Sequence, residues 1–256
     1  MPTREWRSRK LLGLFMLMLA GVALAQEITV AAAADLQSAM PEIASLFRKN
    51  TGKTVKVVYG SSGNFFQQIQ QGAPFDLFFS ANLDYANRLE AAGLVEPGTV
   101  YRYATGRIVL WVPSESPLDL GKGLAVLADP AVRKIAIANP AHAPYGQAAV
   151  AAMKKKNLYD RVSGKLVLGE NISQAASFVA TGSADAGIIA LSAALSPGLK
   201  GKGRYLEVPD ADYPPIEQAC VILKGSRQKQ RAREFLEFMK TPEAAQILRR
   251  YGFEVK

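Results

Sequence analysis

The stretch that decides the fold is residues 56–71, KVVYGSSGNFFQQIQQ, which passes from a β-branched run through a turn into a helical pattern. Its first residues, KVVY, predict a strand, and residues 65–71 have the spacing of an amphipathic helix. The turn between them places the hydroxyls of Ser61 and Ser62 and several backbone N–H groups at the positive end of that helix. Such an end binds anions without a cation, although a single Ser-Ser-Gly turn more often only caps a helix. The anion interpretation gains weight because similar turns recur at least three more times.

Strand and helix patterns alternate along almost all of the chain after residue 26. The predicted strands are residues 28–33, 55–59, 77–80, 108–112, 135–138, 165–168, 186–190, 206–208 and 219–223. The predicted helices are residues 36–49, 65–71, 84–92, 146–155, 173–181, 228–240 and 242–251. This alternation predicts an α/β fold with mixed, mostly parallel sheets that are covered by helices on both faces.

Two segments are typical of chain crossings between lobes, namely residues 103–106 (YATG) and 212–216 (DYPPI). If both cross, lobe 1 consists of residues 27–105 and 216–256, and lobe 2 of residues 106–215. The 231 residues from Gln26 onward are many for one core and suit two lobes. Ligands in such folds bind in the cleft, beyond the carboxyl ends of the strands.

Residues 1–25 predict a secretory signal peptide. Four basic residues precede an apolar run that begins at Leu11, and Ala23-Leu24-Ala25 forms a small-x-small cleavage site. The run is shorter than the roughly 20 residues of a membrane span. It has no twin arginine, and no cysteine follows the cleavage site. We therefore expect a protein that is exported through the general secretory route and has no lipid anchor.

Charge and cysteine content exclude some partners. The net charge of +9 falls to +6 without the leader, which carries four basic residues and one acidic residue. Much of the excess lies in residues 224–233 (KGSRQKQRAR), without the interleaved aromatic residues of a nucleic-acid groove. We therefore expect no nucleic-acid partner. Cys220 is the only cysteine, so no intramolecular disulfide can form, and its apolar neighbours predict a buried, inert thiol.

Four predicted strand-to-helix turns carry small or polar residues. They are residues 32–35 (AAAD), 61–64 (SSGN), 139–146 (NPAHAPYG) and 169–173 (GENIS). Two fall in each lobe, so closure of the cleft would surround a small anion with neutral donors from both sides. No His/Cys/Asp/Glu cluster has the spacing of a metal site.

These turns lie in motifs that resemble those of the periplasmic molybdate-binding proteins, the ModA family. The similar segments, in the family's order, are residues 27–36 (EITVAAAADL), 59–64 (YGSSGN), 72–81 (GAPFDLFFSA), 106–111 (GRIVLW) and 139–146 (NPAHAPYG). The resemblance spans essentially the whole chain after the signal peptide. It implies a two-lobed class II solute-binding fold that delivers molybdate, often also tungstate, to an inner-membrane ABC permease. It further implies a monomer without a cofactor, in which molybdenum is bound only as its oxyanion and has no direct bond to the protein.

The resemblance also implies which residues bind the ligand, namely Ala34, Asp35, Ser61, Ser62, Tyr145 and Ile172. Ser62 matches the family's serine, with Ser61 beside it. Ile172 matches a backbone N–H donor. Tyr145 matches a position at which some members have tyrosine and others a small residue that uses its backbone N–H. Ala190 stands where some members have a tyrosine, so we expect Tyr145 to supply the phenol that Ala190 lacks.

Asp35 stands where many members have Ser or Asn, and it leaves two alternatives open. A site made only of donors prefers a fully deprotonated dianion such as molybdate, whereas a carboxylate in the site would favour a protonated oxyanion such as hydrogen phosphate or arsenate. In the first alternative, Asp35 is the N-cap of the helix from Leu36, and its carboxylate turns to the N–H groups of Gln37 or Ser38. The preference of N-caps for Asp favours this alternative.

Other function classes find less support in the sequence. A hydrolase would have to pair a serine with His142, the only histidine, and the chain has no G-x-S-x-G motif. We therefore predict a binding protein and not an enzyme, with His142 in a loop near the cleft. The alternatives are a binding protein for sulfate or phosphate, and a periplasmic oxyanion sensor without a role in transport.

Overall fold

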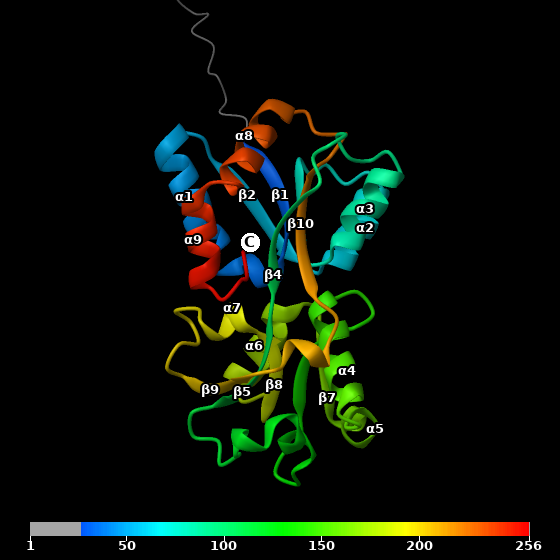
Figure 1. Ribbon diagram of the computed structural model, residues 1–256, viewed down its shortest axis with the longest axis vertical. Helices are drawn as coiled ribbons and strands as arrows, with labels where there is room; N and C mark the ends of the chain where they lie inside the picture. The colour runs from blue at the N-terminus through cyan, green and yellow to red at the C-terminus, as the bar shows by residue number, and fades with distance from the viewer. Residues whose placement is uncertain (1–26, 256) are drawn as a thin grey trace, which may run out of the picture.

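The computed structural model describes residues 27–255, which form two lobes that are each built around a five-stranded sheet (Figure 1). The predicted signal peptide lies outside the described residues. Within residues 27–255, no helix has both the length and the apolar character needed to cross a membrane.

Lobe 1 contains the sheet with strand order β2-β1-β3-β10-β4. Its strands are β1 (Ile28–Ala33), β2 (Val55–Gly60), β3 (Leu77–Ser80), β4 (Tyr101–Gly106) and β10 (Ile216–Ile222). Its helices are the 3-10 helix η1 (Ala34–Gln37) and the α-helices α1 (Met40–Thr51), α2 (Ser62–Gln70), α3 (Leu83–Ala91), α8 (Lys229–Met239) and α9 (Pro242–Arg250). In Figure 1, α1 and α9 lie on one side of the sheet and α2 and α3 on the other.

Lobe 2 contains the sheet with strand order β7-β6-β8-β5-β9. Its strands are β5 (Ile108–Pro113), β6 (Ile135–Ala138), β7 (Leu166–Gly169), β8 (Ala186–Ala190) and β9 (Gly203–Glu207). Its helices are α4 (Pro144–Lys155), α5 (Tyr159–Val162), α6 (Ile172–Ala180), α7 (Leu191–Ala194) and the 3-10 helices η2 (Leu120–Ala128), η3 (Ser163–Lys165) and η4 (Asp210–Asp212).

The chain passes between the two sheets twice. Only Arg107 separates β4 from β5, and residues 208–215 join β9 to β10. Residues 103–106, which we expected to form the first crossing, complete strand β4, and the chain passes to β5 at Arg107. The strand β5, which enters lobe 2, and β10, which re-enters lobe 1, run antiparallel to both of their neighbours. Each sheet therefore has two parallel and two antiparallel pairings, a more mixed arrangement than strand–helix alternation predicts.

The central strands of lobe 1 are apolar on both faces because helices cover both faces. On β1, Val30 and Ala32 pack into one core cluster and Ala31 into another. On β3, Phe79 joins the first cluster and Phe78 the second. Successive side chains of a strand point to opposite faces, so a continuous apolar run is the expected sequence of a doubly covered strand.

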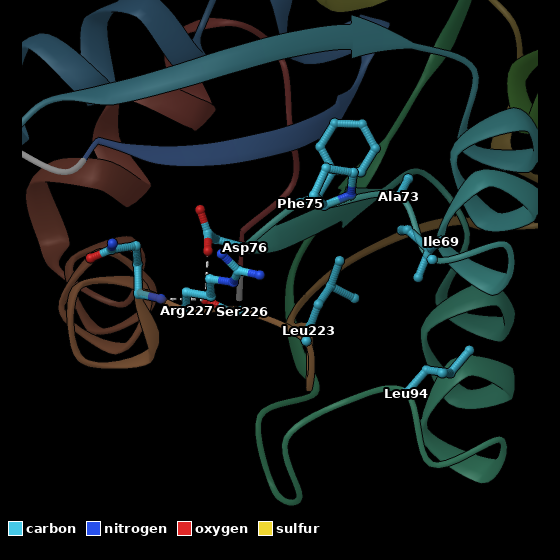
Figure 2. A pocket seen from close by; sticks show the side chains of 12 residues that line it. Ile69, Ala73, Phe75, Asp76, Leu94, Leu223, Ser226 and Arg227 are labelled. Atoms are coloured by element: carbon cyan, nitrogen blue, oxygen red, sulfur yellow. Dashed lines mark hydrogen bonds between the residues drawn. The ribbon is translucent and has the colours of Figure 1, made fainter.

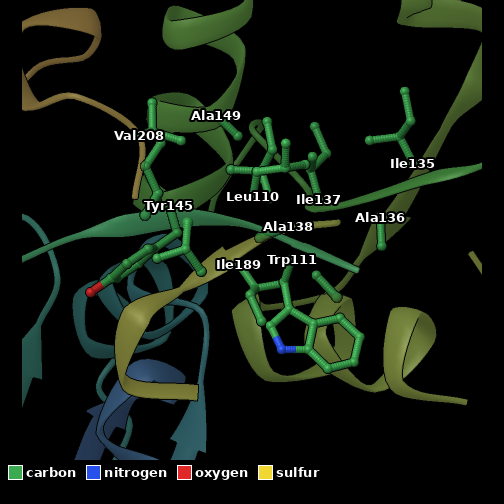
Figure 3. Packing of buried hydrophobic residues seen from close by; sticks show 14 of the residues in the cluster. Leu110, Trp111, Ile135, Ala136, Ile137, Ala138, Tyr145, Ala149, Ile189 and Val208 are labelled. Carbon is green, nitrogen blue, oxygen red and sulfur yellow. The ribbon is translucent and has the colours of Figure 1, made fainter. Parts of the chain in front are cut away.

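The core of lobe 2 gathers around β5, β6 and β8 (Figure 3). Trp111 and Leu110 on β5 and Ile137 on β6 are fully or almost fully buried. Tyr145 lies at the edge of this cluster, and Figure 3 shows its hydroxyl pointing away from the apolar side chains. A buried phenol at such an edge needs a polar partner, and this partner comes from lobe 1.

The predicted helix over residues 36–49 is wrong at its start. The structure has a short 3-10 helix at Ala34–Gln37, and α1 begins only at Met40. Pro41 lies in the first turn of α1, where its missing N–H and fixed φ are tolerated, whereas in a helix from residue 36 it would break the hydrogen-bond ladder. Because α1 begins only at Met40, the residues directly after β1 form a short separate helix at the cleft between the lobes.

Candidate functional site

Four strand-to-helix turns meet at a small cavity between the lobes. Its lining comprises Ala33, Ala34, Asp35, Gly60, Ser61, Ser62, Ala81, Ala143, Pro144, Tyr145, Asn171 and Ile172. All six residues predicted to bind the ligand are therefore brought together. No lysine or arginine is among these lining residues.

Backbone N–H groups at helix starts supply much of the polarity of the cavity. The helices α2, α4 and α6 begin at Ser62, Pro144 and Ile172, all of which line it. The first N–H groups of a helix have no intrahelical partner and carry the positive end of the helix dipole. In α6, the Asn171 side chain accepts from the N–H groups of Ser173 and Gln174, which leaves the N–H of Ile172 for another partner.

The two serines after β2 have different roles in the closed structure. The Oγ of Ser62 accepts a hydrogen bond of 2.9 Å from the backbone N–H of Ala81. Within residues 27–255, the Ser62 hydroxyl proton has no protein acceptor, so it can be donated into the cavity. The Oγ of Ser61 instead donates to the backbone oxygen of His142 in lobe 2, at 2.5 Å. Ser61 therefore lines the cavity, and its hydroxyl forms a hydrogen bond between the two lobes.

Asp35 is buried, and its carboxyl group bonds with side chains from both lobes. Its Oδ2 accepts a hydrogen bond of 2.9 Å from the Tyr145 hydroxyl and one of 2.7 Å from the Gln218 amide. The amide oxygen of Gln218 in turn accepts from the Tyr103 hydroxyl at 2.9 Å. The expectation that Asp35 caps a helix from Leu36 is wrong, because it lies inside η1, whose N-cap is Ala33, and accepts long-range donors instead.

Burial changes the acidity of this network. It raises the pKa of Asp35 from 3.8 to about 6, against the opposing effect of the Tyr145 and Gln218 hydrogen bonds and the nearby backbone N–H groups of Asp35 and Leu36. Burial and the Asp35 carboxylate hold the pKa values of Tyr145 and Tyr103 well above their usual range. Both phenols therefore keep their protons and act as donors.

We expected the Tyr145 phenol to donate to the ligand, but the Asp35 carboxylate competes for the same proton. The phenol has one proton, and that proton goes to Asp35. Tyr145 still lines the cavity, and its backbone N–H lies in the first turn of α4. Ala190 is buried at the start of α7 and does not appear among the lining residues.

Several hydrogen bonds hold the lobes closed around the cavity. The hydroxyls of Ser173 and Ser192 in lobe 2 donate to the backbone oxygens of Ala34 and Asp35 in lobe 1, each at 2.8 Å. The backbone N–H of Gly63 donates to His142 O at 2.9 Å. A Cβ atom on Gly63 would lie 2.5 Å from that oxygen, so the close approach requires glycine.

A serine, a histidine and a carboxylate lie next to one another as in a catalytic triad, but their hydrogen bonds run differently. They are Ser61, His142 and Glu170. The Nδ1 of His142 lies 2.9 Å from Ser61 Oγ, and its Nε2 lies 3.8 Å from a carboxylate oxygen of Glu170. With the Ser61 hydroxyl donating to the His142 backbone oxygen, an imidazole that carries its proton on Nδ1 donates to Ser61 Oγ and does not accept the serine proton. The direction is opposite to that of an activated nucleophile.

Sequence reasoning missed Gln218, Ser173 and Ser192. Gln218 gave no local signal, because it follows Glu217 and precedes the predicted strand over residues 219–223, and its complete burial is a finding of the structure. Ser173 and Ser192 act on backbone atoms of the other lobe, and nothing in the local sequence indicates such partners.

A wider pocket in lobe 1 is built differently (Figure 2). Its buried carboxylate, Asp76, accepts from the backbone N–H of Thr29 at 2.7 Å and from the Ser226 hydroxyl at 2.6 Å. Both oxygens are thus used to fix the start of β1 to the segment before α8.

Within residues 27–255, no group of three or more His, Cys, Asp or Glu side chains could hold a metal ion.

Comparisons with known proteins agree over nearly the whole described chain. A family model described as "Bacterial extracellular solute-binding protein" matches residues 28–254. The chain is 40% identical to the molybdate-binding protein ModA of Rhodobacter capsulatus over 231 residues, which cover 90% of this chain and 89% of that protein. It is 39% identical to ModA of Azotobacter vinelandii over 236 residues, or 92% and 93% of the two chains. The solved periplasmic molybdate-binding protein of A. vinelandii superposes with a TM-score of 0.85 at 34% identity, covering 90% of this chain and all of that one.

Proposed function

The chain belongs to the bacterial extracellular solute-binding proteins and, within them, to the ModA family, and we propose that it captures molybdate, and tungstate as well, in the cavity between its lobes. The observation that carries this proposal is the convergence of the starts of η1 and α2 from lobe 1 with those of α4 and α6 from lobe 2. A tetrahedral oxyanion presents acceptors in four directions, which suits donors that approach from four turns.

The donors that we assign to the oxyanion are neutral. They are the Ser62 hydroxyl and the backbone N–H groups of the first turns, including those of Tyr145 and Ile172. Hydrogen bonds to a charged partner contribute about 1.5–3 kcal/mol each, so six or seven give roughly 10–20 kcal/mol before costs. Lobe closure and lost ligand freedom then leave about −8 to −12 kcal/mol, a micromolar to nanomolar dissociation constant.

Delivery to an ABC permease follows from this assignment. We place the protein in the periplasm as a monomeric receptor, without a lipid anchor, a nucleic-acid partner or a resident cofactor. Molybdenum would be held through the oxygen atoms of the anion alone. The arrangement of Ser61 and His142 supports binding rather than hydrolysis, because the serine proton points to a backbone carbonyl.

Titration calorimetry on refolded, ligand-free protein tests the proposal. Molybdate and tungstate should bind in the micromolar to nanomolar range and raise the melting temperature strongly, while sulfate and phosphate at equal concentration should not. At 100 times the dissociation constant, a ligand adds about 2.7 kcal/mol to the free energy of unfolding. Tighter binding of phosphate than of molybdate would reject the assignment.

A further inference from the structure

One carboxyl oxygen of Asp35 makes no hydrogen bond within residues 27–255, although the backbone N–H groups of Asp35 and Leu36 lie near the carboxyl group. Its Oδ2 accepts from Tyr145 and Gln218, whereas Oδ1 is buried and has no hydrogen-bond partner. The side chain is 97% buried and lines the cavity that we assign to the oxyanion. A buried carboxyl oxygen without a partner at a ligand cavity indicates a bond that forms only when the ligand is present.

That bond needs a proton. An ionised carboxylate only accepts hydrogen bonds, and a fully deprotonated oxyanion also only accepts, so their oxygens would repel each other. A proton on Oδ1 turns this contact into an O–H···O⁻ hydrogen bond, a strong type of hydrogen bond in proteins. Oδ2, which already accepts from two donors, keeps both of them in either protonation state.

We propose that Asp35 takes up one proton from the solvent when the oxyanion binds and donates it through Oδ1 to a ligand oxygen, so that capture of the dianion is coupled to protonation. This inference rests on the proposed function, because it takes the occupant of the cavity to be a dianion.

The groups around Asp35 provide no positive charge that would replace the proton. Tyr145 of α4 and Tyr103 of β4 face it as protonated phenols. The elements β1, α6 and α7, which pack around η1, carry no titratable side chain. The other packed elements, β2 and α1, contribute Lys56, Tyr59, Glu42, Arg48 and Lys49. None of these bonds or pairs with Asp35 in the described part of the chain, and Glu42 is engaged by Arg250 and Tyr251.

The pKa of Asp35 supports this assignment. Burial in the closed arrangement already raises it to about 6 without the charge of a ligand. A carboxyl group with this pKa is almost completely ionised at pH 7.5, so the ligand-free protein begins without the proton. A dianion beside Oδ1 raises the pKa further, so the proton is taken up on binding. The affinity for molybdate should therefore fall about tenfold for each pH unit between pH 6.5 and 8.5.

Calorimetry in two buffers tests the inference directly. Molybdate is titrated at pH 7.5 in PIPES and in Tris, whose ionisation enthalpies differ, and the difference in observed heat gives the number of protons taken up. The wild-type protein should take up about one proton per molybdate. Asp35→Asn, which keeps an oxygen for Tyr145 and Gln218 and offers an N–H₂ in place of Oδ1, should take up none and bind with a pH-independent affinity. Asp84→Asn, which removes an exposed carboxylate on α3, should behave as the wild type.

The outcomes separate the two claims. Molybdate binding by the wild type with no proton uptake, or a flat pH profile, would overturn the role of Asp35 and leave the proposed function intact. Proton uptake that persists in Asp35→Asn would also overturn it, since the proton would then sit on another group. If molybdate gives no binding in any buffer, the proposed function fails, and with it the inference. The wild-type titrations decide the matter even if the variant does not fold.

Discussion

The Tyr145 hydroxyl donates a 2.9 Å hydrogen bond to Oδ2 of Asp35, and this bond joins lobe 2 to lobe 1 at the wall of the ligand cavity. Both side chains are almost completely buried. Because Tyr145 belongs to α4 and Asp35 to η1, the bond forms only when the cleft is closed. Oδ2 of Asp35 is therefore bonded across the closed cleft, and we assign the ligand contact to Oδ1.

Gly63→Ala should weaken molybdate binding without destabilising lobe 1. The added Cβ would lie 2.5 Å from His142 O, so the lobes could not approach fully. We expect a loss of about 1–3 kcal/mol in binding free energy, the usual cost of over-packing. Alanine favours helix over glycine by about 1 kcal/mol, so the ligand-free melting temperature should stay equal or rise. Calorimetry and thermal unfolding measure the two effects.

Gly164→Ala is the matched control for this variant. A Cβ at Gly164 meets no atom within 4 Å, so neither affinity nor closure should change. Unchanged molybdate affinity in Gly63→Ala would show that the contact between Gly63 and His142 is not required for ligand capture.

Ser62→Ala should weaken molybdate binding by about 1–3 kcal/mol, the scale of one hydrogen bond to a charged group. It should also lower stability, because the buried N–H of Ala81 loses its acceptor. Calorimetry gives the first effect and urea unfolding of the ligand-free protein the second. Ser114→Ala, at an exposed position in lobe 2, should change neither. A stability loss without any loss of affinity would restrict Ser62 to a structural role.

The sequence predicted the positions of the turns after β2 and β6 because each is encoded locally, although α2 and α4 begin at Ser62 and Pro144 and not at the predicted residues 65 and 146. Gly60 to Asn64 and Asn139 to Gly146 combine a strand end, small residues and a helix start within a few positions. The long-range network could not be predicted in this way. Asp35 has a strong local preference for an N-cap, yet it is bonded by Tyr145 and Gln218, which lie 110 and 183 residues further along the chain. Tertiary partners override a local preference whenever burial leaves a polar group without water.

Asp35→Asn should make the closed, ligand-free protein more stable at neutral pH. The folded pKa of about 6 lies above the ordinary value of 3.8, so the contribution of Asp35 to stability is fully present below about pH 3.8 and is lost as the pH rises through about 6. Relative to the variant, the wild type should lose up to about 3 kcal/mol across this window. Urea unfolding of both proteins between pH 4 and 8 measures the difference, and parallel curves would contradict the raised pKa.

Cys220 should stay unreactive in the native protein. Its thiol is fully buried in β10, and burial raises its pKa well above the usual range, so the thiolate that reacts with disulfide reagents is scarce. A chromogenic disulfide such as DTNB should report no thiol at pH 8 before unfolding and one thiol per chain in guanidinium chloride. Rapid labelling of the native protein would mean that β10, and with it Gln218, opens readily.

A crystal structure of the molybdate complex, with anomalous data collected at the molybdenum absorption edge, tests the central claim most directly. The account predicts one strong anomalous peak inside the cavity. The oxygen atoms of the molybdate at that peak should lie within hydrogen-bonding distance of the Ser62 hydroxyl, the Ile172 N–H and Asp35 Oδ1. A peak at another place on the protein, or an ordered closed cavity without molybdenum, would contradict it.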